Sequence, residues 1–267
     1  MPIHATAIVD PAAEIDSSAE IGAYAIVEKD VRILAGARVY PHAYIAQGTT
    51  LGERCEVHPF AVVGHLPQDL KFEGASSYTR IGEATIIREH ATIHRGTMPG
   101  STTVVGRGCF IMSAGHIGHN CTVGDHVTMA NGTMLAGHVE IGDRAFLSGN
   151  AMVHQFVRVG ELVIASGGAR VTNDVPPFMT VCPTGVVGPN VVGLRRAGLT
   201  SEERHEIRRA YKTLYRTGLP FSKAIELVAE MVQTAPGRRL MDFLRSPSKR
   251  TYMSYKGVGR PEAQVAE

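Results

Sequence analysis

The sequence predicts a mainly β protein, a left-handed parallel β-helix of hexapeptide repeats followed by a small C-terminal α-helical domain. An aliphatic side chain recurs at nearly every sixth position from Ile3 to Val171, and a small residue often stands four positions later. After Thr200 the apolar period changes to that of a helix. A period of six is neither helical spacing nor strand alternation. It is typical of a solenoid in which each repeat is one short strand and a turn.

The hexapeptide register is almost unbroken. Of the 29 positions that it covers, only four are not Ile, Val, Leu or Met, namely Asp69, Ala75, Pro99 and Ala165. Three hexapeptides in each triangular coil make about 18 residues, which predicts about nine to ten coils. Segments 65–80 and 98–104 keep the register but lose the repeat chemistry. We expect them to form loops, where binding residues tend to lie.

The helical part follows a different pattern. Thr200 and Glu203 have the spacing of a capping box, and an apolar stripe then runs to Gly218. Further helices are expected at 222–234 and 238–245. We therefore divide the chain into a β-helix domain, residues 1–190, and a C-terminal α-helical domain, residues 191–267, with a disordered tail expected within 247–267.

Composition limits the possible classes of protein. The four cysteines include no Cys-x-x-Cys pair, so neither a disulfide framework nor a cysteine zinc site is indicated. The first twenty residues lack a signal pattern and no long apolar run occurs, so we expect a cytoplasmic protein without a transmembrane segment.

Charge is unevenly distributed along the chain. Residues 1–190 carry a net charge of −5 and residues 191–267 a net charge of +7. The basic part is open to several interpretations: nucleic acid, anionic lipid, an acidic protein partner, or solvated helix faces. The absence of Trp argues against a base-stacking nucleic-acid surface.

Several histidines share one edge of the predicted prism. Counted in coils of about 18 residues, His119, His138 and His154 fall on the same corner of three successive coils, and His116 lies around the turn. Neighbouring strands are about 4.8 Å apart, so these imidazoles should form a column. Histidine is both a frequent general base and a frequent metal ligand. Spacing alone leaves both roles open.

Seven motifs, in order and followed by a helical tail, resemble a known family. They are QDLK (68–71), IHRGT (93–97), HNCTVG (119–124), LAGHV (135–139), HQF (154–156), DVPP (174–177) and GLRRAG (193–198). Together they resemble the acyl-carrier-protein–UDP-N-acetylglucosamine O-acyltransferases of lipid A biosynthesis, over about residues 3–245. The resemblance implies a homotrimer with active sites between subunits. It also implies transfer of an R-3-hydroxyacyl chain from acyl carrier protein to the glucosamine 3-hydroxyl of UDP-N-acetylglucosamine, the first step of that pathway.

The resemblance also implies roles for individual residues. His119 matches the general base, and the backbone N–H of Gly137 matches the oxyanion donor. Asn190 and Arg196 match residues that hold the nucleotide phosphates. The basic tail would face the acidic carrier protein, and no metal or other cofactor is implied. The remaining matches, to contacts with the acyl and sugar-nucleotide groups, are Asp69, Lys71, His94, His116, His138, His154 and Gln155.

This chain departs from the family pattern at Asn120, Val192 and Ala197. Asn120 stands where the family commonly has Asp, so it can accept a hydrogen bond from the His119 ring but cannot stabilise an imidazolium by charge. Val192 and Ala197 replace residues that are often polar or charged, which thins the nucleotide contacts. Gly167 matches a position where bulk limits acyl length, and as glycine it leaves room for a longer chain.

Three alternatives stay open. The first is a zinc hydratase of the γ-carbonic-anhydrase type, which is also a hexapeptide β-helix that uses three histidines. The second is an acyltransferase that acts on a 3-amino sugar nucleotide and forms an amide. The third is a scaffold that has lost activity through Asn120.

Overall fold

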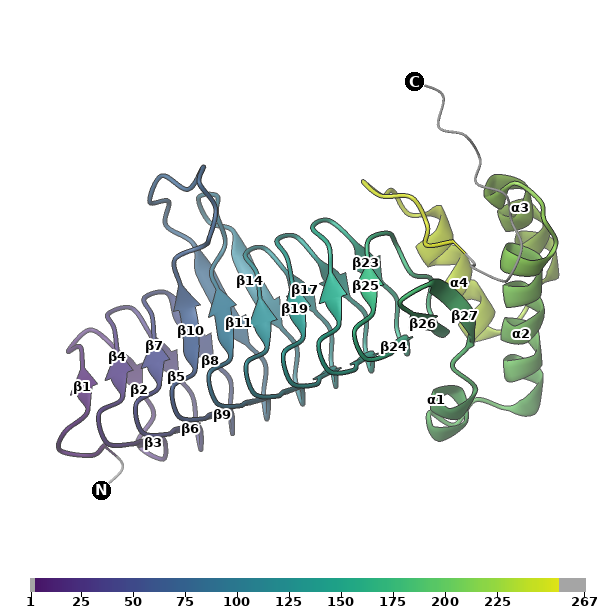
Figure 1. The fold of residues 1–267 in the computed structure, drawn as a ribbon. Coiled ribbons are helices and arrows are strands. Elements are labelled where there is room, and N and C mark those ends of the chain that lie inside the picture. The colour runs from purple at the N-terminus through teal and green to yellow at the C-terminus, as the bar shows by residue number, and fades with distance from the viewer. Residues whose placement is uncertain (1–2, 255–267) are drawn as a thin grey trace.

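A triangular prism of parallel strands makes up most of the molecule (Figure 1). The computed structural model describes residues 3–254. Three sheets of nine, eight and ten strands form the faces of the prism, and each coil adds one strand to each face. The left-handed parallel β-helix predicted from the sequence is confirmed.

The strands are short, most of them two residues long, and they are described here by face. The first face contains β1 (Ile8–Val9), β4 (Ile26–Val27), β7 (Tyr44–Ile45), β10 (Val62–His65), β13 (Thr92–His94), β16 (His116–Ile117), β19 (Met134–Leu135), β22 (Met152–Val153) and β25 (Arg170–Val171). The second face contains β2 (Glu14–Ile15), β5 (Arg32–Ile33), β8 (Thr49–Leu51), β11 (Tyr78–Ile81), β14 (Thr102–Val105), β17 (Thr122–Val123), β20 (Glu140–Ile141) and β23 (Arg158–Val159).

The third face runs from the first coil to a terminal hairpin. It contains β3 (Glu20–Ile21), β6 (Arg38–Val39), β9 (Glu56–Val57), β12 (Ile86–Ile87), β15 (Phe110–Ile111), β18 (Thr128–Met129), β21 (Phe146–Leu147), β24 (Ile164–Ala165), β26 (Met179–Cys182) and β27 (Gly185–Pro189). Only β26 and β27 pair antiparallel within residues 3–254.

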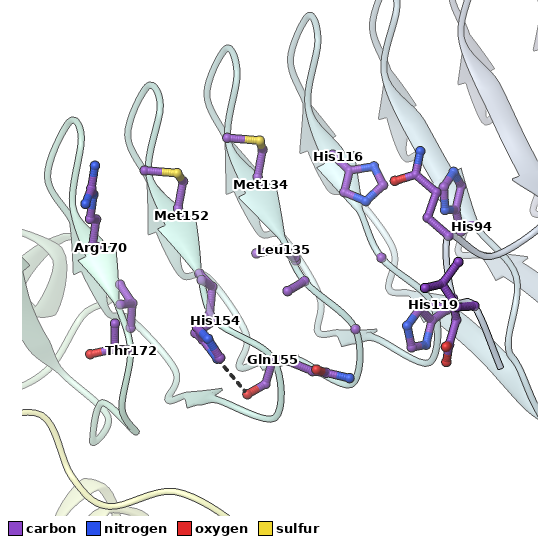
Figure 2. A pocket seen from close by; sticks show the side chains of 18 of the residues that line it. His94, His116, His119, Met134, Leu135, Met152, His154, Gln155, Arg170 and Thr172 are labelled. Atoms are coloured by element: carbon purple, nitrogen blue, oxygen red, sulfur yellow. Dashed lines mark hydrogen bonds between the residues drawn. The ribbon is translucent and has the colours of Figure 1, made fainter.

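Register fixes which side chains are neighbours. Ile117 pairs with Leu135, and His116 pairs with Met134. Each partner lies 18 positions further along the chain, as the hexapeptide count predicts. Ile117 and Leu135 are fully buried in the prism, whereas His116 and Met134, which precede them, point outward (Figure 2). Each two-residue strand therefore gives its face one inward and one outward side chain.

Some turns of the prism require glycine because of close backbone packing and not because of a positive φ. Gly106 does not have a positive φ, but a Cβ there would lie 2.5 Å from the carbonyl oxygen of Gly124 in the next coil. Close approach of neighbouring backbones therefore demands glycine at such positions. The left-handed turn positions are held largely by other residues, including Asn120 and His138, both with φ of 59°.

Three of the four cysteines serve as core residues. Cys55, Cys109 and Cys121 are free and buried. Burial raises the pKa of Cys55 and Cys109 to about 11 and that of Cys121 to about 12. The Cys121 thiol donates to the carbonyl of Ala136 over 3.1 Å. These thiols act as small hydrophobic side chains, and each stands at the small-residue position of its repeat.

Four helices lie at the C-terminal end of the prism (Figure 1): α1 (Val191–Arg196), α2 (Ser201–Arg216), α3 (Phe221–Met231) and α4 (Ala235–Arg245). The predicted capping box is confirmed, because Thr200 and Glu203 exchange hydrogen bonds at the start of α2. The buried Glu206 carboxylate accepts hydrogen bonds from the backbone N–H groups of Gln233 and Thr234. The Glu206 side chain of α2 therefore satisfies backbone N–H groups of the segment that leads into α4.

After α4 the chain returns to the last coil of the prism. We call residues 246–254 the C-terminal strap. The backbone N–H of Met253 donates to the backbone carbonyl of Asp174 over 2.8 Å. The backbone N–H of Asp174 donates to the backbone carbonyl of Thr251 over 2.9 Å. Of the tail that was expected to be disordered, residues 255–267 lie outside the described part of the chain. No helix within 3–254 is long and apolar enough to cross a membrane.

Candidate active site

A pocket of about 880 Å³ lies over the first face of the prism (Figure 2). Its floor is a row of outward side chains from successive strands: His116, Met134, Met152 and Arg170. The predicted site residues that line it are Asp69, Lys71, His94, His116, His119, Gly137, His154 and Gln155. The repeat brings these residues together from four coils and one projecting loop.

Asn120 fixes the hydrogen position on His119. The backbone N–H and Oγ1 of Thr97 lie 3.1 and 2.8 Å from Asn120 Oδ1. A backbone N–H can only donate, so this Asn120 atom is the oxygen and not the nitrogen of the amide. The same oxygen lies 3.0 Å from His119 Nδ1, which confirms the expected ring contact. Nδ1 therefore carries the hydrogen, and Nε2 keeps its lone pair.

Gly137 lies directly against this imidazole. A Cβ at position 137 would stand 2.4 Å from His119 Cε1 and 2.5 Å from Nε2. Any side chain larger than hydrogen would therefore collide with the ring. Within residues 3–254, no hydrogen bond from the Gly137 N–H is found, whereas its carbonyl accepts from Phe156 over 3.1 Å. The lone pair of Nε2 and a free backbone donor thus lie side by side in the pocket.

The histidine column is shorter than the spacing predicts. His119 and His138 are in edge-to-face contact with ring centroids 5.2 Å apart, but the next ring against His138 is Phe156, at 4.8 Å. His154 stands two residues before Phe156 and lines the pocket. His138 is not among the residues that line the pocket. His138 and His154 hold slightly different positions in their respective coils, and this difference puts only His154 at the pocket.

His94 and His116 form a second contact pair at one end of the pocket floor. Their ring centroids are 5.0 Å apart in an edge-to-face arrangement, and His116 Nδ1 lies 2.7 Å from Thr92 Oγ1. Burial, followed by the neighbouring imidazoles His116, His65 and His119, lowers the pKa of His94 to about 4. Burial also lowers the pKa of His116. Both rings are accordingly held neutral near pH 7.

Asp69 and Lys71 come from the predicted loop. It projects from the prism between β10 and β11 (Figure 1). Asp69 Oδ1 accepts a hydrogen bond from the backbone N–H of Lys71 over 3.0 Å, and Leu70 between them is fully exposed. This turn places one carboxylate and one ammonium group at the rim of the pocket.

The other predicted site residues lie elsewhere in this chain. Asn190 is buried and caps α1, where its Oδ1 accepts from the N–H of Gly193 and its Nδ2 donates to Leu162, both over 2.8 Å. Arg196 is exposed at the end of α1. A Cβ at Gly167 would contact only the carbonyl oxygen of Gly149, at 3.6 Å, so space remains there.

Sequence reasoning missed much of the pocket floor. Met134, Met152 and Arg170 occupy the outward place just before a buried aliphatic residue. The available signal was an exposed apolar pair 18 positions apart, on the same face as His116. Gln68 and Thr172 complete the rim. Within residues 3–254, no three His, Cys, Asp or Glu side chains are arranged to hold a metal, so the zinc interpretation gains no support.

Comparison with known proteins gives consistent matches. Residues 174–253 match the family described as UDP N-acetylglucosamine O-acyltransferase, domain 2. The acyl-(acyl-carrier-protein)–UDP-N-acetylglucosamine O-acyltransferase of Thermodesulfovibrio yellowstonii is 45% identical over 91% of this chain and 96% of its own. The enzyme of the same name from Caulobacter vibrioides is 44% identical over 94% and 97%.

A solved structure agrees with these relatives. The UDP-N-acetylglucosamine acyltransferase of Francisella novicida superimposes with a TM-score of 0.91 at 37% identity, covering 94% of this chain and 93% of that one. Identity and coverage of this extent include both the prism and the helices. The chain therefore belongs to the family of acyl-(acyl-carrier-protein)–UDP-N-acetylglucosamine O-acyltransferases.

Proposed function

We propose that the protein transfers an R-3-hydroxyacyl chain from acyl carrier protein to the glucosamine 3-hydroxyl of UDP-N-acetylglucosamine, the first step of lipid A biosynthesis. The observation that carries the mechanism is the chain of contacts from Thr97 through Asn120 to His119. It leaves the Nε2 lone pair of His119 free to accept a proton. A general base must have such a lone pair within reach of the reacting hydroxyl.

The reaction balances with His119 as the one proton carrier. Nε2 takes the proton of the sugar hydroxyl while that oxygen attacks the thioester carbon. The carbon–sulfur bond then breaks, and the departing thiolate of the carrier takes the proton back from Nε2. Because Asn120 is neutral, the transient imidazolium is stabilised by its Nδ1–H bond and not by a carboxylate charge.

Gly137 would act on the other reacting atom. In the tetrahedral intermediate, the former carbonyl oxygen of the thioester carries a negative charge. The backbone N–H of Gly137 can donate a hydrogen bond to that oxygen. Removing one such donor from comparable sites costs about 3–4 kcal/mol. Proximity of Gly137 to Nε2 allows both groups to address one carbonyl carbon.

Substrate contacts follow from the pocket walls. Asp69, Lys71 and His154 present charged and polar groups at the rim, and His94 and His116 lie together at one end of the floor. Met134 and Met152 give the floor an apolar surface that suits an acyl chain. We infer no cofactor, since each step uses a proton carrier, a backbone donor and binding groups of the chain itself.

We further propose a homotrimer in which each cleft uses two subunits. Asn190 and Arg196 lie outside the pocket of their own chain, so they would serve a neighbouring one. The basic C-terminal part would meet the acidic acyl carrier protein, with Arg208 and Lys212 on one side of α2. We also propose that the enzyme acts in the cytoplasm.

The test is acyl transfer with a panel of hydroxyacyl carrier proteins and UDP-N-acetylglucosamine, followed by mass analysis of the product. An ester product and an activity loss of at least about a hundredfold in His119→Ala would support the proposal. The matched control is His126→Ala, an exposed histidine on another corner of the same coils. Full activity of His119→Ala would overturn the mechanism, and product formed only with a 3-amino sugar nucleotide would overturn the acceptor assignment.

A further inference from the structure

The C-terminal strap is anchored to the prism by a buried carboxylate. Asp174 has no exposed surface and accepts from Arg158 Nε over 2.8 Å. The same Asp174 oxygen accepts from the hydroxyl of Ser248 over 2.6 Å. The Ser248 hydroxyl in turn accepts from the backbone N–H of Arg250 over 2.9 Å. Position 250 is thereby fixed relative to the last coils of the prism.

Arg250 reaches from this anchor to His154. Its Nη2 lies 2.7 Å from His154 Nδ1, and its Nε donates to the carbonyl of Gln155 over 3.0 Å. The two contacts spread the guanidinium group over adjacent residues of one turn. Both of these residues line the pocket, so a segment 96 positions away in sequence touches its wall.

This contact decides the tautomer of His154. A guanidinium has donors only, so the 2.7 Å contact requires a lone pair on Nδ1. Nδ1 also lies 3.4 Å from the carbonyl oxygen of Gln155, which would require a hydrogen on the same nitrogen (Figure 2). The shorter contact has normal hydrogen-bond length and involves a full charge, so it prevails. Nε2 then carries the hydrogen.

We propose that Arg250 is a positioning residue that holds His154 as a hydrogen-bond donor toward the pocket through Nε2–H. The ligand group that it serves is an oxygen acceptor of a substrate, namely a hydroxyl, carbonyl or phosphate oxygen. This role rests on the proposed function, whereas the tautomer does not. His119 and His154 therefore present opposite groups to the pocket: a lone pair on one ring and an N–H on the other.

The tautomer is tested by ¹⁵N NMR of histidine-labelled full-length protein, with the His154 signals assigned through a His154→Gln variant. The parent should show a protonated Nε2 and an unprotonated Nδ1. In Arg250→Ala, the contact with the Gln155 carbonyl should take over and move the hydrogen to Nδ1. Arg250→Lys keeps a donor and should keep the parent pattern. The matched control is Arg245→Ala, which removes an exposed charge at the end of α4.

Kinetics test the role in the reaction. In Arg250→Ala we expect KM for one of the two substrates to rise about three- to tenfold at nearly constant kcat, the worth of one hydrogen bond. Parent spectra with the hydrogen on Nδ1, or unchanged spectra in Arg250→Ala, would overturn the positioning. A changed tautomer with both KM values unaltered would overturn the substrate contact. If the parent transfers no acyl group, the proposed function fails while the NMR result still decides the role of Arg250 toward His154.

Discussion

At the scale of single residues, the proposed mechanism rests on Thr97, Asn120, His119 and Gly137. Each member constrains the next: Thr97 orients the amide, the amide orients the imidazole, and the imidazole excludes a side chain at 137. Asn120 can occupy its left-handed turn because asparagine tolerates positive φ better than most residues. A neutral amide therefore meets both the backbone and the hydrogen-bonding requirements at this corner.

Gly137→Ala should impair catalysis far more than folding. The three atoms nearest the added Cβ all belong to the His119 ring, so the ring and not the prism backbone would have to shift. We expect kcat to fall about a hundredfold, as for a misplacement of about 1 Å, with little change in melting temperature. The matched control is Gly149→Ala, whose Cβ would meet only a carbonyl oxygen at 3.5 Å. Equal losses of activity in both variants would contradict the argument.

His94 should make folding stability depend on pH. Its pKa is about 4 in the fold, mainly because of burial, and near 6.5 in the unfolded chain. Between these values the unfolded chain binds more protons, so the stability contributed by neutral His94 is present above pH 6.5 and falls as pH drops toward 4. The loss amounts to about 3 kcal/mol at most.

The measurement is urea unfolding of the parent and His94→Gln between pH 7 and pH 4 at one protein concentration. The variant lacks the titrating ring, so its free energy of unfolding should decline less steeply over this interval. Parallel declines in the two proteins would show that His94 contributes nothing to the acid sensitivity.

At the scale of elements, the first face gives the pocket its direction. Met134 and Met152 form an apolar floor on β19 and β22, and Arg170 on β25 ends it with an exposed cation. An acyl chain that follows this row leaves apolar surroundings when it reaches Arg170. Strand pairing at 18-residue intervals is what puts the three side chains in line.

Arg170→Leu should shift acyl preference toward longer chains. Leucine would extend the apolar floor by one coil, and each additional buried methylene is worth about 0.8 kcal/mol, or about fourfold in kcat/KM. The measurement is kcat/KM over hydroxyacyl carrier proteins of graded chain length. Arg38→Leu is the control, because Arg38 has the equivalent outward place on the third face. An unchanged preference would show that the chain takes another path.

Regular elements were predictable from sequence, whereas contacts across irregular segments were not. Burial of Ile117 and the cap at Thr200 follow from local patterns, so period and spacing were sufficient. The bond from Thr97 to Asn120 crosses the interruption at 98–104, where the 18-residue count no longer gives neighbours. The bond from Arg250 to His154 joins the strap to the prism, and nothing periodic relates them.

At the scale of the whole molecule, the prism and the helical end differ in net charge as well as in shape. The acidic prism bears the pocket, and the basic helical end lies beyond the last coil (Figure 1). An acidic carrier protein would be attracted to the helical end and repelled by the prism. Association should accordingly weaken as ionic strength rises.

Light scattering should give a mass of about three times the 28.7 kDa of one chain. The proposed trimer places Asn190 and Arg196 of one subunit at the cleft of another, so activity should require association. Mixing Arg196→Ala chains with His119→Ala chains should then restore part of the activity. Some clefts would combine an intact His119 from the first chain with an intact Arg196 from the second. A monomer of full activity would contradict this arrangement.

His119 and Gly137, the proposed proton acceptor and backbone donor, stand on consecutive coils, 18 positions apart. Adding one complete coil between them would draw the pair apart by about 4.8 Å and end their cooperation. The same addition before Tyr44 would merely lengthen the rod, because stacked repeats touch only their nearest neighbours. The prism can therefore vary in length over evolution in its N-terminal coils, while the stacking of the coils that carry residues 119 and 137 must stay fixed.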